Sequence, residues 1–425
     1  MMNIYRLFLS IFFLFPMLAS CQQKVESFPD DDDDDKVIEY LADWQEGYLD
    51  IHQISTGRGN AAYLILPDGT TMLIDAGDLG IHTGSQEIMK PMPNNSKTPA
   101  EWITHYIKHF SAPLDKEVAL DYAFITHFDR DHIGSVDDTA IMDAKYGYKL
   151  SGITHLGNLL DIKTLVDRDY PNYNYPSASS FTAAHIANYK LYVADRKNSG
   201  KKNEGFVVGS NSQFKLLKKP SAYPTFEVRN IVGNGKIWTG SGTETEEMVP
   251  STASSSQQFN ENRTSCGIRI TYGNFDYFSG GDIQGVQKSP EWFDIETPVG
   301  RLIGETDVVV ANHHAYSDAM TDTFISLVKA QAYIIPVWDY YHPQPKPLAD
   351  MLSANLYPGE RMVFAAGLVA SNRSRLGENG ARIKPDGHVV TRVYPGGDKF
   401  QVFVLNDTND NYEIIYKTTE LKSNN

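Results

Sequence analysis

The sequence predicts an α/β protein, and three features of the chain carry this prediction. Short apolar runs in which polar residues alternate, such as Tyr48–Ser55, are typical of half-buried strands. The segment Thr98–Phe110 instead has its apolar residues at helical spacing, and Thr98 or Ser96 can serve as its N-cap. Ligand-type side chains such as His127 follow directly after several apolar runs, at the position where open sheets build their sites.

The first elements follow in a simple order from Trp44, near which the folded region begins. After the strand Tyr48–Ser55, a turn containing glycine and an apolar run occupy Thr56–Leu66. The turn signal Pro67–Gly69 leads into a strand over Thr70–Gly77, so these two strands form a hairpin. The predicted helix follows, and then a short buried strand ends at His127.

The pattern weakens from Lys149 to about Arg263, where Tyr, Asn, Ser, Lys and Gly are frequent. We expect an insertion with long loops at about 155–263, and such loops tend to be functional or mobile. Regular structure returns with a hairpin over Cys266–Asp282 that turns at Gly273-Asn274. Two apolar strands then end in histidine, at His314 and His342, and a β-rich tail begins at His388.

Composition limits the kind of site this protein can have. The net charge is −15, of which the run Asp30–Asp35 supplies six, leaving −9 for the rest. An acidic body lacks the basic stripe typical of nucleic-acid-binding proteins, although a small metal-centred cleft is compatible with it. The only cysteines are Cys21 and Cys266, so a disulfide framework and a thiolate zinc site are both excluded. Any metal ion must therefore be held by imidazole and carboxylate.

The N-terminus is predicted to be a targeting segment. Residues 1–20 combine Arg6 with an apolar stretch and then small residues, as a signal peptide does. "LASC" resembles a bacterial lipobox, which implies lipid modification of Cys21; an ordinary secretory signal is the alternative. Residues 21–45 form an acidic flexible tether that either acts as a spacer or resembles the surface-export signal of some lipoproteins. We therefore expect an extracytoplasmic protein, lipid-anchored to the bacterial outer membrane and, if the tether is an export signal, exposed on the cell surface.

The stretch "ITHFDRDHIG" concentrates four ligand-type side chains, those of His127, Asp129, Asp131 and His132. Burying such groups without partners is unfavourable, and a metal ion would compensate them. Four such donors can divide between two cations about 3.5–4 Å apart, as in two-metal hydrolases. Nitrogen and oxygen ligands without sulfur suit zinc, manganese or iron.

The same stretch resembles the metallo-β-lactamase superfamily signature His-x-His-x-Asp-His, with Asp129 in the second histidine position. This variant is similar to the ComEC/Rec2 competence-protein branch of extracytoplasmic metallohydrolases. The likeness extends from about Ile51 to Val404. It includes an opening hairpin with Asn60 where an acidic residue is usual, and a Gly-Asp that ends at Asp282.

Two later segments also resemble the family. "DVVVANHHAYSDA" resembles its His-His-Gly-Ser segment, with Ala315 in place of the glycine, and "DYYHPQP" resembles a His-Pro segment. The resemblance implies a four-layered αββα metallo-β-lactamase sandwich with two mixed sheets and an inserted loop-rich region, occupying residues 46–420.

The resemblance also implies a set of ligands for two divalent ions, zinc or alternatively manganese. His127 and Asp129 would hold one ion, Asp131 and His132 the other, and Asp282 would bridge them. His342 is the preferred last ligand, with His313 as the competitor, and His314 would then contact the substrate as an acid or charge stabiliser. Asp131 would also orient the attacking hydroxide. A further histidine that family members often carry has no recognisable counterpart among His155 and His185, the only histidines in the corresponding interval.

The function implied is hydrolysis of phosphodiester bonds by a metal-bound hydroxide. The substrate would be a small molecule or a polymer, such as nucleic acid or a phospho-substituted envelope polymer, and no protein partner is indicated. Two alternatives remain, an amide or lactone hydrolase on the same fold and a non-catalytic surface binding or uptake lipoprotein with a degenerate metal site. Asp75 is expected to support the histidines as a turn or neighbouring carboxylate. Four histidines have no companions in the sequence and are given no role: His52, His105, His109 and His388.

Overall fold

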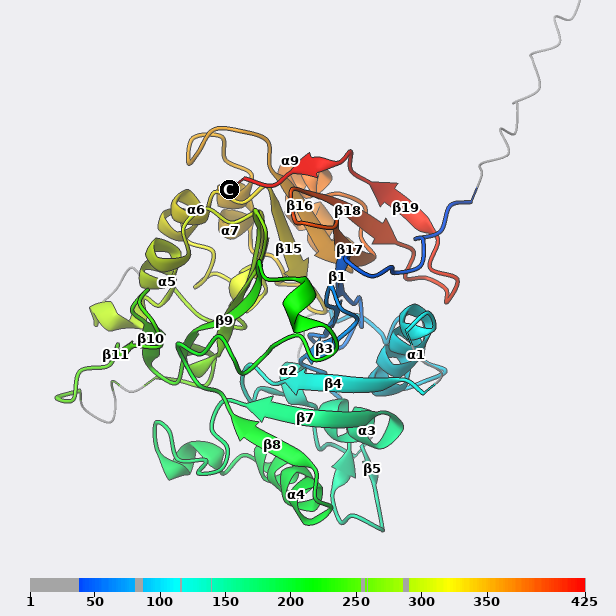
Figure 1. Ribbon diagram of the computed structural model, residues 1–425, viewed down its shortest axis with the longest axis vertical. Helices are drawn as coiled ribbons and strands as arrows, with labels where there is room; N and C mark the ends of the chain where they lie inside the picture. The colour runs from blue at the N-terminus through cyan, green and yellow to red at the C-terminus, as the bar shows by residue number, and fades with distance from the viewer. Residues whose placement is uncertain are drawn as a thin grey trace, which may run out of the picture. The chain divides into compact units, whose positions relative to one another are not determined.

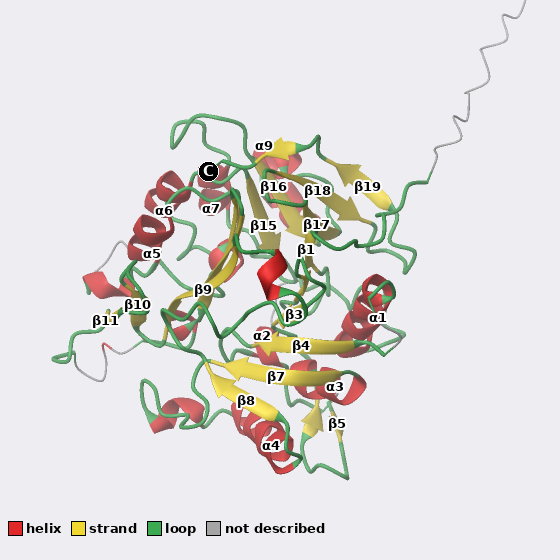
Figure 2. Cartoon of the chain, in the orientation of Figure 1, coloured by secondary structure: helices red, strands yellow, loops and turns green. Residues whose placement is uncertain are grey.

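Two mixed β-sheets lie face to face, and helices cover the outer face of each sheet (Figure 1, Figure 2). The computed structural model describes residues 38–424 except 81–86, 115–116, 139, 254–256, 258 and 286–289. From Glu39 onward the chain forms one compact unit. The predicted signal peptide, Cys21 and most of the tether lie outside the described residues.

The first sheet combines an antiparallel half with a parallel half. In order across the sheet its strands are β19 (Ile414–Lys417), β18 (Lys399–Leu405), β17 (His388–Val393), β1 (Leu49–Gln53), β2 (Ala62–Ile65), β3 (Thr71–Ile74), β4 (Ala119–Phe124), β7 (Asp161–Asp167) and β8 (Lys202–Gly205), and β20 (Leu421–Lys422) pairs with β18. The pairs from β3 to β8 are parallel and the others are antiparallel.

The second sheet has the same division. Its strands are β11 (Thr245–Glu247), β10 (Lys236–Trp238), β9 (Phe226–Gly233), β12 (Gly267–Tyr272), β13 (Phe275–Ser279), β14 (Val308–Val310), β15 (Ala332–Pro336) and β16 (Met362–Ala366). Pairing is parallel from β13 to β16 and antiparallel elsewhere. A small separate hairpin joins β5 (Ile141–Met142) to β6 (Lys149–Leu150).

Three apolar cores separate the four layers. The first core lies between the first sheet and α1 (Pro99–Ser111), α3 (Gly152–Leu159) and α4 (Ala184–Asn198). The second lies between the two sheets, and the third lies between the second sheet and α5 (Glu296–Ile303), α6 (Asp322–Val328) and α7 (Pro345–Met351). Short helices α8 (Ala370–Arg375) and α9 (Gly377–Arg382) follow β16. The predicted αββα arrangement with two mixed sheets is what the chain adopts.

Local sequence signals explain why several elements begin and end where they do. In β3, Leu73 faces the helix-side core while Met72 and Ile74 face the other sheet, because side chains alternate along a strand. Thr98 caps α1, where its hydroxyl accepts from the Glu101 amide while the Glu101 side chain accepts from the Thr98 amide. The predicted hairpin at Gly273-Asn274 joins β12 to β13, which pair in register on either side of it.

The stretch expected to be a loop-rich insertion is more regular than the sequence pattern indicated. Strands β7 and β8 extend the first sheet beyond β4, and β9 pairs with β12 inside the second sheet. Neither strand shows a regular alternation of buried and exposed residues along its whole length. In β7 the alternation is confined to the first residues, and β9 is only partly buried at its start. The residues 155–263 therefore form part of both sheets and are joined by loops and by α4.

The arrangement brings the carboxyl ends of the parallel strands from both sheets to one edge of the molecule. β3, β4 and β7 are parallel in the first sheet, as are β13, β14 and β15 in the second. Between the sheets at this edge, the Cys266 amide donates to the Thr126 carbonyl at 2.9 Å. The loops after these strands therefore meet. Among the described residues, we find no helix with the length and apolar character needed to span a membrane.

Candidate metal centre

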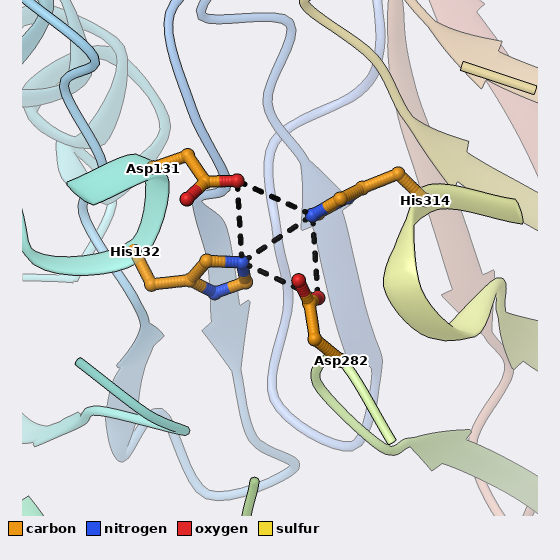
Figure 3. Close-up of side chains that lie close together, drawn as sticks. All are labelled: Asp131, His132, Asp282 and His314. Atoms are coloured by element: carbon orange, nitrogen blue, oxygen red, sulfur yellow. Dashed lines mark hydrogen bonds and ion pairs between the residues drawn. The ribbon is translucent and has the colours of Figure 1, made fainter. Parts of the chain in front are cut away.

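Four side chains from three separate loops converge at this edge (Figure 3). Asp131 and His132 belong to the short helix α2 (Arg130–Ile133), Asp282 follows β13, and His314 lies in the single turn η6 (Asn312–Ala315). One ligand atom from each of the four lies within 4.8 Å of the other three. The residues that the sequence placed far apart therefore form one cluster, which we call the His132 cluster.

The contacts within the His132 cluster centre on one oxygen atom. Asp282 Oδ1 lies 3.3 Å from His132 Nε2 and 3.2 Å from His314 Nε2. Asp131 Oδ2 lies 3.8 Å from His132 Nε2 and 3.5 Å from His314 Nε2. Two imidazoles and two carboxylates thus point their free atoms toward a common space, as Figure 3 shows.

His132 is fixed from behind by Asp75, as expected. Its Nδ1 donates to Asp75 Oδ2 at 2.7 Å, which leaves Nε2 facing the cluster. Asp75 also accepts from the Asn60 amide side chain at 2.9 Å and from the Thr126 amide and hydroxyl, both at 2.8 Å. Asn60 acts here as a donor to the Asp75 carboxylate, which an ionised acidic side chain at this position could not do.

A second group of potential ligands lies on the other side of Asp282. His127 Nε2 is 3.7 Å from Asp282 Oδ2 and 3.7 Å from Asp129 Oδ2. His313 Nε2 is 3.9 Å from the same Asp282 oxygen. Asp282 therefore directs one oxygen to each group, which is the geometry that a bridging carboxylate needs. Asp129 is the most exposed of these side chains, at 41%.

His313 is held at the rim of the site. Its Nδ1 donates to Asp318 Oδ1 at 2.6 Å, and its Nε2 lies 2.9 Å from the Asn262 side-chain amide. Burial disfavours the imidazolium form, but the hydrogen bond to Asp318 and the charge of Asp282 outweigh it and raise the pKa of His313 to about 9. The ring is 17% exposed, so it can contact a molecule that enters from solvent.

His342, which the sequence favoured for the last ligand, lies beside the His132 cluster and is not one of its four residues. Its ring packs against those of His314 and Trp338, at centroid distances of 4.8 and 4.9 Å. Burial, aided by the neighbouring His314, lowers the pKa of His342 well below its usual range, so this ring is neutral. The ring that enters the four-residue cluster is His314, the one expected to contact the substrate.

The histidines of the interval before Asp282 are also accounted for. His155 lies on α3, with Nδ1 3.3 Å from the Thr98 hydroxyl. His185 lies on α4 and hydrogen-bonds the backbone of Phe128, close to Asp129, while its Nε2 is buried without a hydrogen-bond partner. The carboxyl end of β7, next to the strand that leads to His127, carries Arg168. Its guanidinium is paired with Glu261.

The electrostatics of the His132 cluster are dominated by its two carboxylates. Burial opposes their ionisation, but the imidazoles around them outweigh it and hold the pKa of Asp131 and of Asp282 well below the usual range. Burial likewise opposes protonation of His132, yet Asp282, Asp75 and Asp131 raise its pKa well above the usual range. These opposite shifts show that the carboxylates stabilise positive charge placed beside them.

The residues present fit a divalent cation. Asp282 Oδ1 and His127 Nε2 are both buried without a hydrogen-bond partner, although potential ligands surround them. Buried polar atoms are normally hydrogen-bonded, so atoms left free at a point of convergence indicate a missing partner. The nitrogen and oxygen donor set matches zinc or manganese.

Some site residues were not recognised in the sequence. Trp338 packs edge-on against His314 at 3.9 Å between centroids, and Asn262 contacts His313. Asp318 lies five residues after His313 in the same quoted segment, so its role could have been inferred from that spacing. Trp338 lies four residues before His342, but neither Trp338 nor Asn262 is of a ligand type, so neither gave such a signal.

The chain matches no protein-family model and no curated protein. Among solved structures it is similar to Zn(2+)-bound PqqB from Methylobacterium extorquens, with a TM-score of 0.32 and 10% identity over 67% of this chain and 88% of that chain. It is also similar to human tRNase Z, short form, with a TM-score of 0.29 and 12% identity over 67% of this chain and 91% of that chain. Similarity at this level assigns no function, so the residues of the site must do so.

Proposed function

We propose that this protein is a metal-dependent hydrolase of the metallo-β-lactamase type that cleaves phosphodiester bonds. The observation that carries the proposal is the convergence of Asp131, His132, Asp282 and His314, whose ligand atoms lie within 4.8 Å of one another. Two carboxylates and two imidazoles gathered with no Lys or Arg in the cluster are best explained by a cation. The order of motifs along the chain supports the metallo-β-lactamase assignment, and the Asp129 variant supports the ComEC/Rec2-like branch.

We assign the ligands from these contacts. The His132 cluster would hold one ion, and His314 takes the place in it that the sequence left between His342 and His313. His127 and Asp129 would contribute to a second position, with Asp282 between the two. A divalent cation supplies Lewis-acid polarisation of a phosphoryl or carbonyl oxygen and lowers the pKa of water.

The remaining chemistry belongs to side chains at the rim. The Asp131 side chain is 18% exposed, against 3% for Asp282, so Asp131 can both bind and orient a water molecule that enters from solvent. His313 Nε2 faces the same space and can deliver a proton to the leaving oxygen, because Asp318 fixes the orientation of its ring. His342 and Trp338 close the site behind His314 and exclude water from that side.

The predicted leader suggests where the enzyme acts, and the resemblance of its motifs suggests the class of its substrate. We propose that it works outside the cytoplasm, anchored through Cys21, on a small or polymeric phosphodiester, with nucleic acid and phospho-substituted envelope polymers as the candidate classes. The two alternatives are amide or lactone hydrolysis on the same fold and non-catalytic binding or uptake by a lipoprotein with a degenerate metal site.

The decisive experiment is metal analysis and turnover by protein that lacks the first 36 residues. About two zinc or manganese ions per chain and turnover of a bis-aryl phosphate are expected. One ion with ester but no phosphodiester turnover would replace the proposal with an ester or amide hydrolase. No ion and no turnover would leave a binding protein with a degenerate site.

Asp131→Ala should abolish phosphodiester turnover while the fold stays largely intact, because this side chain lies at the rim and not in the core. A loss of more than about 100-fold is expected, above the range for residues that only support a ligand. Asp121→Ala is the matched control, since Asp121 lies in β4, the strand that leads to the site, and bonds Thr71 and Lys163. Turnover retained in Asp131→Ala, or lost equally in the control, would contradict the mechanism.

A further inference from the structure

Glu296 is a buried carboxylate that the proposed chemistry does not use. It is the first residue of α5 and is fully buried, at 0% exposure. Its hydrogen-bond donors are all neutral groups, from Asn312, Met320 and Thr321. Burying a carboxylate without a cationic partner is strongly unfavourable. A buried carboxylate at position 296 therefore indicates a role that a neutral side chain would fulfil less well.

The two oxygens of Glu296 hold both ends of one segment. Oε1 accepts from the Asn312 side-chain amide at 2.8 Å and from the Met320 backbone amide at 2.7 Å. Oε2 accepts from the Thr321 backbone amide at 2.9 Å. The segment from 312 to 321 carries His313, His314 and Asp318, so it supplies the second sheet's histidines to the site.

This segment has a strained backbone. His313, His314 and Ala315 have φ values of 43°, 52° and 55°, and Met320 has 53°. Each left-handed residue other than glycine costs about 1–2 kcal/mol, so four of them do not persist unless surrounding contacts hold them. Ala315, where the family has glycine, is one of the four.

Other contacts also hold this segment, and one of them joins its two ends directly: the Asn312 backbone amide donates to the Met320 sulfur at 3.3 Å. The His313 amide donates to the Gly281 carbonyl at 3.2 Å, and the Ala315 carbonyl accepts from the Gln344 amide at 2.9 Å. Gly285 lies on the loop that follows Asp282, and a Cβ atom there would approach Glu296 Oε2 to 2.6 Å. Glu296 thus contacts both ends of the segment that carries His313 and His314, and it lies against the loop that follows Asp282.

We propose that Glu296 is a positioning residue that holds His313 and His314 in the strained geometry required by the metal centre. The inference rests on the metal site proposed above and extends it to a residue that contacts no ligand atom. Its carboxylate acts as a clamp because it accepts at two oxygens at once. A glutamine has the same shape but offers a single accepting oxygen, so it cannot satisfy all three donors.

The test compares Glu296→Gln with Asp307→Asn in the full-length chain. Asp307 is also buried, at 1% exposure, and accepts from Asp276, Gln331 and Asn424. It precedes β14, whereas the segment held by Glu296 follows that strand, so Asp307→Asn disturbs a buried carboxylate at the far end of the same element. Zn²⁺ affinity is measured by competition with a chromophoric chelator, together with thermal unfolding and kcat and KM for a bis-aryl phosphate.

Glu296→Gln should weaken Zn²⁺ binding by about 10–100-fold and lower kcat more than it raises KM. Asp307→Asn should leave Zn²⁺ affinity within about twofold, because it is remote from the site. Adding Asn312→Asp to Glu296→Gln lets the amide donate to a carboxylate at position 312 and should restore part of the affinity. Equal affinity in Glu296→Gln and wild type, or equal losses in both single variants, would overturn the proposal.

Two further measurements distinguish a failure of the proposed metal site from a failure of the proposed role of Glu296. If Glu296→Gln does not fold, Asn312→Ala removes one of the three donors, and unchanged Zn²⁺ affinity in that variant would overturn the clamp. If the wild-type protein binds no Zn²⁺, the metal site fails, and the imidazole NMR signals of His313 and His314 decide the role of Glu296. Signals that shift in Glu296→Gln but not in Asp307→Asn support it, and unshifted signals contradict it.

Discussion

Within the part of the chain that the structure describes, two groups of buried histidines differ in kind, and the first has the properties of a metal centre. The His132 cluster gathers two imidazoles and two carboxylates at the carboxyl ends of parallel strands. The other group consists of His52 and His388 on β1 and β17, with Tyr106 of α1 between their rings; we call it the Tyr106 group. Its ring centroids lie 5.7 Å from His52 to Tyr106 and 4.6 Å from Tyr106 to His388.

In the Tyr106 group, one nitrogen of each imidazole has a hydrogen-bond partner. His52 Nδ1 lies 3.0 Å from the Tyr106 hydroxyl, and His388 Nδ1 accepts from the Ser55 amide at 3.1 Å. The nearby carboxylate of Asp50 accepts two hydrogen bonds from Arg392, at 2.8 and 2.6 Å. Its negative charge is therefore already balanced by a guanidinium.

One feature distinguishes the candidate metal site from the histidines that are packed in the core. Both groups contain an imidazole nitrogen that is buried without a hydrogen-bond partner, for example His388 Nε2 and His127 Nε2. An unpartnered nitrogen alone therefore does not identify a metal ligand. What the His132 cluster has, and the Tyr106 group lacks, is a pair of carboxylates directed at the imidazoles with no Lys or Arg side chain in the cluster.

The largest effect that separates the two groups is expected from Arg392→Ala. This change leaves Asp50 buried without its partner and should lower the free energy of unfolding by about 3–5 kcal/mol. Chemical denaturation measures the loss, and Zn²⁺ affinity of the folded fraction should be unchanged. A loss of metal binding in Arg392→Ala would show that the two groups are coupled. It would contradict the conclusion that the Tyr106 group has no part in metal binding.

A smaller effect is expected from the metal itself. Zn²⁺ at 100 times its dissociation constant should raise the free energy of unfolding by about 2.7 kcal/mol, because it binds the folded chain only. Denaturation curves with Zn²⁺ and with excess EDTA give this difference directly. His388→Gln should retain the increase and Asp131→Ala should lose most of it. An equal increase in both variants would mean that the ion binds outside the His132 cluster.

The sequence was sufficient to predict most of the fold. Alternation in Tyr48–Ser55, the capping signal at Thr98 and the turn at Gly273-Asn274 each depend on neighbouring residues, and each appears in the structure as expected. The strands β7 and β9 were missed because their burial depends on partners that are distant in sequence. A pattern within seven or eight residues does not show that a strand pairs with β4 or β12.

The candidate site shows the same difference between signals carried by neighbouring residues and contacts that depend on residues distant in sequence. His127, Asp131 and His132 lie within six residues of one another, and Asp282 follows a recognisable hairpin. The sequence alone therefore predicts that these four residues belong to one site. The choice among His313, His314 and His342 depends on left-handed backbone angles at three consecutive residues, which no pattern in the sequence indicates. His52 and His388 are separated by more than 300 residues and lie close together in space because β1 pairs with β17.

The smallest effect concerns the pH dependence of the Tyr106 group. Burial lowers the pKa of His388 from 6.5 to about 3. The unfolded chain therefore binds a proton at His388 at a higher pH than the folded chain does. The stabilisation from this group is complete above pH 6.5 and is lost as the pH falls toward 3. Between pH 7 and pH 5.5 the loss should be about 1 kcal/mol.

The substitution His388→Gln isolates this contribution. Glutamine keeps an acceptor for the Ser55 amide but does not titrate, so the stability of this variant should fall less between pH 7 and pH 5.5 than that of the wild type. Burial also lowers the pKa of His52 well below its usual range, so part of the acid sensitivity should persist in the variant. Denaturation curves at the two pH values, recorded in excess EDTA, keep metal release out of the comparison. An identical pH dependence in both proteins would mean that folding does not lower the pKa of His388 and would contradict this prediction.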